Sequence, residues 1–193
     1  MILSDKATAA PSTEPVTLAE AKAYLRVDFS DDDSLITEII KSARRRAEDV
    51  TNRSIITQTR RAVLSEFPAS DFYLPSGPVT EITSIQYFDT DNQEQTLTEG
   101  TDYLEELDGD TALIRFLERP SLSENKIGPI RISYSAGHAT VAEISPNIIT
   151  AIKMLIAHYY DNRNPVVAGS EARHEVPETV KAILNRNHSI AGF

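Results

Sequence analysis

The sequence predicts an α+β fold, in which a helical bundle of about four helices carries an antiparallel β-rich insertion between the second and third long helices. Apolar residues recur at helical spacing in residues 17–53 and again after residue 146. Between these segments, short runs rich in β-branched and aromatic residues alternate with turn signals. Because each helix buries only one stripe, we expect the helices on both sides of the insertion to pack together.

These patterns divide the chain into segments of different character. The first residues are small, polar and proline-containing, and the last ones carry no periodic pattern. We therefore expect a flexible N-terminal arm at residues 1–15, a helical core domain at 16–54 and 141–186, a β-rich insertion at 55–140, and a flexible C-terminal tail at 187–193.

Two helices are predicted before the insertion. Thr17 and Glu20 are spaced as in a capping box, which favours a helix start at Thr17. Residues 31–33 are all aspartates and precede the second helix, where acids suit the positive end of the helix dipole and one of them can cap it. The stripe of this second helix consists of Leu35, Ile36, Ile39, Ile40, Ala43, Ala47 and Val50.

The middle of the chain predicts an antiparallel sheet or small sandwich of about five to seven strands. Two turn signals, at residues 75–78 and 89–92, separate the clearest strands. The expected strands are residues 54–64, 72–74, 79–88, 95–97, 103–104, 112–116 and 130–134.

Helices resume after the insertion. Ser145 followed by Pro146 is a typical helix start, because serine caps well and proline suits the first turn. Pro177 opens a last short helix, and we expect residues 166–175 before it to form a mobile loop. The apolar face of the long helix comprises Ile148, Ile149, Ile152, Leu155, Ile156 and Tyr159.

Composition narrows the possible partners. The net charge of −10 over 193 residues argues against a general nucleic-acid binder, which normally presents a basic face. Arg44, Arg45 and Arg46 are either a solvated helix face or a charged contact face for an acidic partner or for DNA in a channel. No apolar run approaches the ~20 residues that span a bilayer, so no membrane partner is expected.

No catalytic, cofactor-binding or metal-binding residue is predicted, and we expect no enzyme. His158 and Asp161 have a possible metal-ligand spacing, but no second pair completes such a site. The sequence contains neither a nucleophile elbow nor a glycine-rich phosphate loop, and it has no cysteine.

Four phrases carry a family resemblance and occur in this order: VTLAEAKAYLRVD, DDDSLITEIIKSARRRAEDVTNRSIITQT, FYLPSGPVTEITSIQYFD and AIKMLIAHYYDNRNPV. Together they resemble the head–tail connector proteins of tailed bacteriophages, also called head-completion or adaptor proteins, and the related proteins of gene transfer agents. The resemblance implies a helical bundle with a β-rich insertion, whose subunits form a ring beneath the portal of the DNA-filled head.

The resemblance also implies a function and partners. It implies a structural virion protein, assembled in the bacterial host cytoplasm, that joins the DNA-filled head to the tail or stopper. Expected partners are the portal protein, the next tail or stopper component, and further copies in a cyclic, by resemblance twelvefold, ring through which DNA passes without sequence-specific binding. Portal or partner contacts are expected at His174, Val180, Ile183, Leu184, Arg186 and Phe193.

Three alternatives stay open. Another virion component, such as a tail-completion protein, would share the helical-plus-sheet design. A DNA-binding regulator using the arginines at 44–46 would bind duplex DNA with strong salt dependence. A hydrolase would need a cleft of converging ionisable residues, and the sequence offers no pair to nominate for one.

Overall fold

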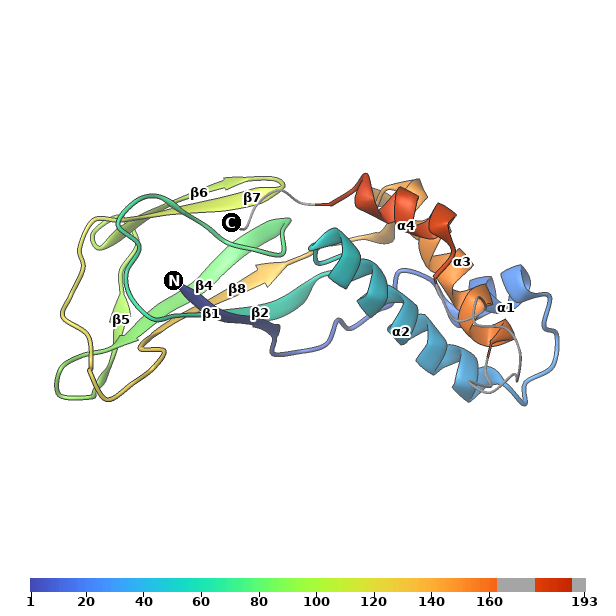
Figure 1. Cartoon of the computed structure of the whole chain (residues 1–193), viewed down its shortest axis with the longest axis horizontal. Helices are drawn as coiled ribbons and strands as arrows, with labels where there is room; N and C mark the ends of the chain where they lie inside the picture. The colour runs from blue at the N-terminus through green and yellow to red at the C-terminus, as the bar shows by residue number, and fades with distance from the viewer. Residues whose placement is uncertain (163–175, 189–193) are drawn as a thin grey trace. The chain divides into compact units, whose positions relative to one another are not determined.

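The structure is a computed structural model that describes residues 1–162 and 176–188. The predicted α+β class is confirmed, with four α-helices and two antiparallel sheets in the described residues (Figure 1). The described chain forms two compact units. The β unit consists of Met1–Ser12 and Thr57–Ala139, and the helical unit consists of the described residues of Thr13–Ile56 and Thr140–His188.

The helical unit is built around one apolar cluster. Its elements are α1 (Leu18–Leu25), α2 (Asp33–Thr51), the short 3-10 helix η1 (Val141–Glu143), α3 (Pro146–Asp161) and α4 (Glu178–Asn185). Ile36, Ile40, Ile152 and Leu155 are among the buried side chains that the long helices contribute to the cluster. The predicted stripe of α2 is correct except at Leu35, which is 38% exposed.

The start of α1 has the predicted capping box. The Glu20 backbone N–H donates to Thr17 Oγ1 at 3.2 Å, and the Thr17 backbone N–H donates to Glu20 Oε2 at 2.9 Å. The start of α2 is different: Asp32 occupies the N-cap position, but its side chain makes no capping hydrogen bond. Instead, Asp32 accepts a 2.6 Å hydrogen bond from the Tyr160 hydroxyl, which ties the end of α3 to the start of α2.

The β unit contains two sheets. The five-stranded sheet has the order β1–β2–β8–β4–β5, with β1 (Ile2–Ala7), β2 (Gln58–Leu64), β8 (Ile130–Ala136), β4 (Val79–Phe88) and β5 (Glu94–Leu97). The three-stranded sheet has the order β3–β7–β6, with β3 (Phe72–Tyr73), β7 (Thr111–Phe116) and β6 (Tyr103–Asp108). All of these named strand pairs are antiparallel.

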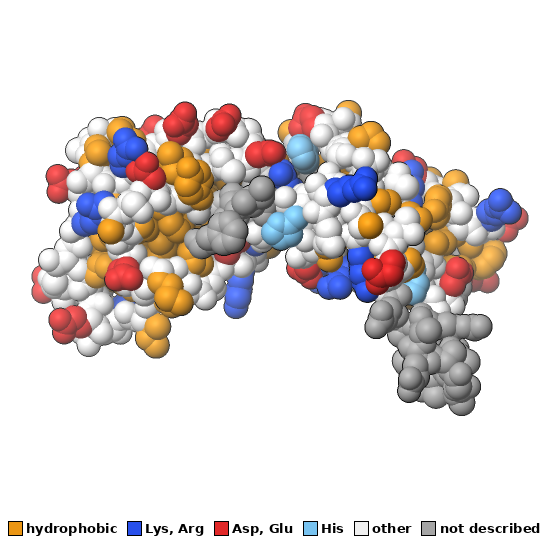
Figure 2. All heavy atoms as spheres, turned by 45° about the horizontal axis from the view of Figure 1, so that its top comes forward, with side chains coloured by type: hydrophobic (Ala, Val, Ile, Leu, Met, Phe, Trp, Pro, Cys, Tyr) orange, Lys and Arg blue, Asp and Glu red, His pale blue; other side chains and the backbone are white. Residues whose placement is uncertain are grey.

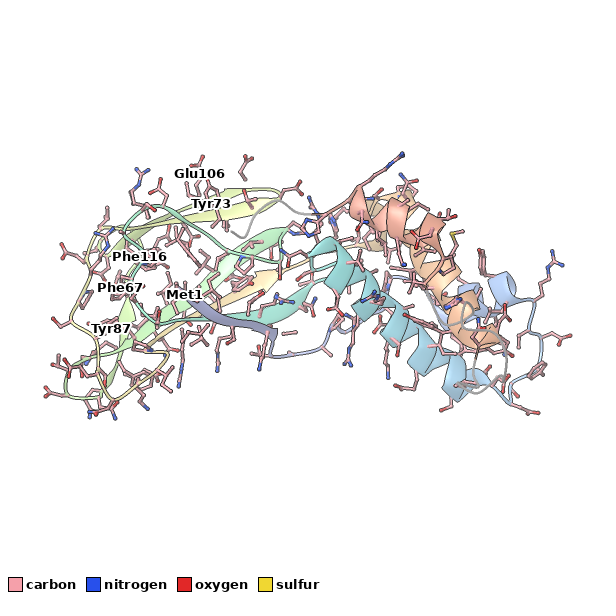
Figure 3. The ribbon with its side chains drawn as sticks, viewed as in Figure 1. Met1, Phe67, Tyr73, Tyr87, Glu106 and Phe116 are labelled. Atoms are coloured by element: carbon pink, nitrogen blue, oxygen red, sulfur yellow. The ribbon has the colours of Figure 1, made fainter. Side chains whose placement is uncertain are left out.

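A second apolar cluster fills the space between the two sheets. Alternation along each strand sends one set of side chains inward, and in β8 that set is Ile130, Ile132, Tyr134 and Ala136. From the smaller sheet, Ile114 and Phe116 point into the same cluster, where Phe116 meets Phe67 edge to face at 5.2 Å between centroids (Figure 3). The outer faces of the two sheets therefore point away from each other.

The N-terminus differs from the expected flexible arm. Ile2–Ala7 forms β1, which pairs with β2 at the edge of the larger sheet. The side chain of Asp5 fixes this strand: its Oδ2 accepts from Arg60 Nη2 at 2.6 Å and from Ser76 Oγ at 2.9 Å, and its Oδ1 accepts from Tyr134 Oη at 2.8 Å. Burial raises the pKa of Tyr134, and the Asp5 carboxylate raises it further, so the phenol keeps the proton that it donates.

Two further expectations concern the mobile segments of the chain and a membrane-spanning helix. The predicted mobile loop at residues 166–175 lies outside the described residues, and so does the tail from residue 189. No helix among the described residues is long and apolar enough to cross a membrane.

Candidate contact surfaces

Arg44 does not belong to a charged contact face, contrary to the sequence prediction. Its side chain is only 3% exposed, because it lies against the helical core rather than in solvent. Its Nε donates to Glu14 Oε2 at 2.7 Å, and its Nη1 donates to Glu48 Oε2 at 2.6 Å. Glu48 in turn accepts from the backbone N–H of Ile55 at 3.0 Å. This arginine therefore joins the entry segment, α2 and the segment that follows α2.

Arg45 and Arg46 are exposed on α2, so only these two members of the run remain available to a partner. The exposed Asp49 lies on the same helix, and both Arg46 and Asp49 are close enough to Tyr159 to influence its pKa. The surface around Arg46 is therefore mixed in charge rather than purely basic, which weakens the case for a DNA-binding helix.

The predicted contact residues on α4 separate into two groups. Val180 and Leu184 are fully buried in the helical core, so their side chains are not available to a partner in this structure. Ile183 is half-buried, and Arg186 is exposed at the C-terminal end of the helix. The Arg53 Nε donates to the Asn187 carbonyl at 2.9 Å and holds this end of α4 near the end of α2.

The remaining two predicted contact residues, His174 and Phe193, lie outside the described residues. Their proposed roles are neither supported nor contradicted by the contacts of the described chain.

Sequence reasoning missed three exposed apolar side chains at and around the α1–α2 connection. Tyr24 on α1 is 47% exposed, Phe29 in the connection is 48% exposed, and Leu35 follows in the first turn of α2. The available signal was the position of Tyr24 and Phe29 outside the apolar stripes, since aromatic side chains away from a core face are candidates for partner contacts.

The described residues offer little for metal chemistry. No group of three or more His, Asp or Glu side chains among residues 1–162 and 176–188 is arranged to hold a metal ion. His158 lies beside Asn162, whose side-chain amide donates to the His158 carbonyl at 2.7 Å, so these residues close the end of α3.

Glu105 is an unusual acid because it points inward from β6. One of its carboxylate oxygens is buried without a hydrogen-bond partner in the described structure. Burial raises the pKa of Glu105, and the negative charges of Glu99 and Glu81 raise it further.

Solved structures with the same fold come from gene transfer agent particles. One, described as the virion of a native gene transfer agent particle, shares 20% identity and a TM-score of 0.78, and the match covers 99% of this chain and 98% of the other. A chain from the neck of an empty particle, computed with C6 symmetry, gives the same values. A third, from the neck of a native particle computed with C12 symmetry, shares 19% identity and a TM-score of 0.74 over the same coverage.

No sequence among the curated proteins matches this chain. A family model does match: the model described as head completion protein covers residues 14–188, which spans both the helical unit and most of the β unit. The chain therefore belongs to the head completion protein family.

Proposed function

We propose that this protein works as a ring of identical subunits in the neck of a virus-like particle, between the portal and the next tail or stopper component. The head–tail connector role expected from the sequence is confirmed by family membership. To this connector role we add the ring of subunits, its binding partners and the surfaces that bind them. The single observation that carries the proposal is the family match over residues 14–188.

A ring is supported by the similar folds in the necks of gene transfer agent particles, which were computed with C6 and C12 symmetry. Both symmetries are compatible with twelve subunits, and a closed ring requires that each subunit use two different surfaces for its two neighbours. The proposed place of the protein is thus the virion neck, after synthesis in the bacterial cytoplasm, and association without catalysis is the proposed mechanism.

The charge of the chain suits a channel for DNA. With a net charge of −10, the subunit as a whole repels the phosphate backbone, so DNA would pass without being held. The mixed charges around Arg46 give no continuous basic stripe on α2 that would oppose this.

The portal contact is proposed for the C-terminal region. On the described part of α4, Ile183 and Arg186 are the two predicted contact residues that a partner can reach. His174 and Phe193 stay in the proposal as sequence-based candidates. Val180 and Leu184 support the contact only by packing α4 onto the helical core.

The test is light scattering behind a sizing column, with the chain alone and with the portal ring of the same particle. A complex with one copy per portal subunit is the expected result. Failure to bind the portal, combined with tight and salt-sensitive binding to duplex DNA, would contradict the proposal and favour a DNA-binding regulator.

A further inference from the structure

The outer face of the three-stranded sheet is apolar in its centre and acidic around it. Tyr73, Leu113 and Glu106 are opposite one another in the register of β3, β7 and β6. Tyr73 is 50% exposed, whereas its neighbour Phe72 packs inward, so Tyr73 lies on the outer face. Leu104, 45% exposed, is opposite Arg115, and Arg115 is paired with Asp71 at 2.6 Å.

The acids of this face exceed its cations. Arg115 pairs with Asp71, and Glu106 is a second acid close to the same arginine, so two negative charges face one positive charge next to the apolar centre. The exposed Asp108 and Asp110 in the β6–β7 hairpin add further negative charge. Figure 2 shows hydrophobic and acidic side chains close together on the side of the β unit that is turned forward there. We call Tyr73, Leu104, Glu106, Asp108 and Leu113 the acidic face.

The outer face of the five-stranded sheet has the opposite charge. Lys6 on β1 is opposite Arg61 on β2, and Arg61 is opposite Ser133 on the central strand β8. Lys6 and Arg61 are both exposed. Two like charges side by side repel each other in the free chain, so an acidic partner would relieve an unfavourable contact.

The apolar part of this second face lies at the end of β4, four residues beyond Ser84, which shares a row of the sheet with Lys6 and Arg61. Phe88 has Lys126 Nζ 4.3 Å and Arg131 Cζ 4.8 Å from its ring centroid. The loop before β8 lies close against the sheet at Gly128, where an added Cβ would come within 2.3 Å of Val63 Cγ1. That loop presents Ile127, which is 89% exposed. We call Lys6, Arg61, Phe88, Lys126, Ile127 and Arg131 the basic face.

The acids near the basic face lie at its Phe88 end. Glu94 pairs with Arg131 at 3.2 Å, Asp89 follows Phe88 directly, and Glu124 is two residues before Lys126. Lys6 and Arg61, on β1 and β2, have no carboxylate of that sheet beside them among the described ion pairs. In a chain with a net charge of −10, such a local excess of cations is selective for an acidic surface.

We propose that the acidic face of one subunit binds the basic face of the next subunit in the ring, an inference that rests on the ring of the proposed function. The two faces cover opposite sides of the same two-layer β unit, because the shared apolar cluster lies between the sheets. Opposite, non-identical surfaces generate a head-to-tail contact, which closes into a ring when the rotation between neighbours divides a full turn. A two-fold contact of either face with itself would instead place like charges together.

Both faces also supply the apolar area that a stable contact needs. Tyr73, Leu104 and Leu113 on one side are matched by Phe88 and Ile127 on the other. Aromatic and aliphatic side chains in the centre of an interface, with charges around them, are the usual arrangement at protein–protein contacts.

Thiol crosslinking tests the proposal directly, since the chain contains no cysteine. Leu104→Cys places a single thiol on the acidic face, and Ser133→Cys places one in the middle of the basic face. Ser70→Cys, exposed in the β2–β3 connection, is the control for random collisions. Each variant is treated with a short bis-maleimide, first alone and then mixed with another variant. Both experiments are done with free protein at high concentration and with protein bound to the portal ring.

The expected result is a covalent dimer only when the Leu104→Cys and Ser133→Cys chains are mixed. A chain that carries both changes is expected to give a ladder of crosslinked species up to the closed ring. Dimers from either single variant, or no crosslink between the two faces in portal-bound protein, would overturn the proposal.

A charge exchange gives an independent readout. Arg61→Glu and Glu106→Lys are each expected to weaken self-association by about tenfold, because each places like charges at the contact. In a chain with both changes, the glutamate introduced at position 61 of one subunit would face the lysine introduced at position 106 of the next. The charges at each contact are then opposite again, so self-association is expected to recover. Asp161→Lys, at an exposed position at the C-terminal end of α3, is the control and is expected to have no effect.

The outcomes separate this inference from the proposed function. Portal binding at ring stoichiometry without crosslinks between the faces overturns the lateral contact and leaves the connector ring intact. Crosslinks between the faces without portal binding support the lateral contact and contradict the proposed portal partner. Loss of duplex DNA binding in Arg61→Glu, with unchanged self-association, would assign the basic face to DNA and overturn the inference.

Discussion

Arg44 and Glu14 are joined by a 2.7 Å hydrogen bond between Nε and Oε2, although they are 30 residues apart in the chain. The arginine is 3% exposed and also pairs with Glu48, so three residues share one largely buried charge cluster. The segment before α1 is thereby fastened to the middle of α2. The arginine that the sequence places within a surface run is therefore a structural residue.

Arg44→Ala is expected to destabilise the helical unit by about 3 kcal/mol, because it leaves the Glu14 and Glu48 carboxylates without the guanidinium that compensates their charge. Arg45→Ala, the neighbouring exposed position, is the matched control and is expected to change stability by less than about 0.5 kcal/mol. Chemical denaturation followed by far-UV circular dichroism measures both values. Equal effects of the two substitutions would contradict the buried role of Arg44.

Periodic patterns predict much of this fold. The stripe of α2 and the alternation of β8 were sufficient because the burial of each residue follows from its own neighbours in sequence. The alternation expected for β4 is wrong, because two register shifts against β8 place its buried residues three apart. The burial of Arg44 depends instead on Glu14, which no local pattern connects to α2. Glu48, four residues after Arg44, was a visible local signal of an ion pair, but it does not distinguish a buried pair from an exposed one.

The first strand was missed for a related reason. Ile2–Ala7 contains Asp5 and Lys6, which are uncommon in strands, and its structure comes from pairing with β2 and from the Arg60–Asp5 contact, 55 residues away. Likewise, the two proposed contact faces of the β unit depend on strand order. Sequence alternation shows which residues share a side of one strand, but not which strands become neighbours.

Asp5→Ala is expected to release β1 from the edge of the sheet and to cost roughly 3 kcal/mol, since Arg60 would stay buried without its carboxylate. Tyr134→Phe removes a hydroxyl that donates to the Asp5 carboxylate and lies 3.0 Å from the Pro75 carbonyl oxygen, and it is expected to cost about 2 kcal/mol. Amide hydrogen exchange is the sharper measurement, because protection should be lost first in Ile2–Ala7. Unchanged protection of β1 in Asp5→Ala would show that the carboxylate does not hold the strand.

Glu105→Met is expected to stabilise the β unit at neutral pH by up to about 1 kcal/mol, because it removes a charge that faces the apolar cluster. The pKa of Glu105 is raised in the folded chain, first by burial and then by Glu99 and Glu81. The destabilisation by the Glu105 charge is therefore complete at pH values above the pKa of Glu105 in the folded chain. It disappears at pH values below the pKa of Glu105 in the unfolded chain.

The melting temperatures of Glu105→Met and the wild-type protein should accordingly converge as the pH falls through the range of these two pKa values. Thermal unfolding over a pH series checks this expectation. Glu106→Met, on the outward side of the same strand, is the control and should give no comparable gain at neutral pH. A difference in melting temperature between Glu105→Met and the wild-type protein that grows as the pH falls would contradict the direction of the pKa shift.

Arg186→Glu is expected to weaken portal binding by about tenfold while leaving the stability of the chain unchanged, because the side chain is exposed at the end of α4. Leu184→Ala is expected to lower stability by about 3 kcal/mol, because the side chain is fully buried. Titration calorimetry with the portal ring, beside thermal unfolding, separates contact from packing. Normal portal binding by Arg186→Glu would remove this residue from the contact.

The central claim is that this protein joins a DNA-filled head to its tail, and counting joined particles by electron microscopy tests it most directly. Particles produced without the chain are predicted to accumulate as separate heads and tails, and addition of the purified protein is predicted to restore tailed particles. Tailed particles that form in normal numbers without the chain would contradict the claim.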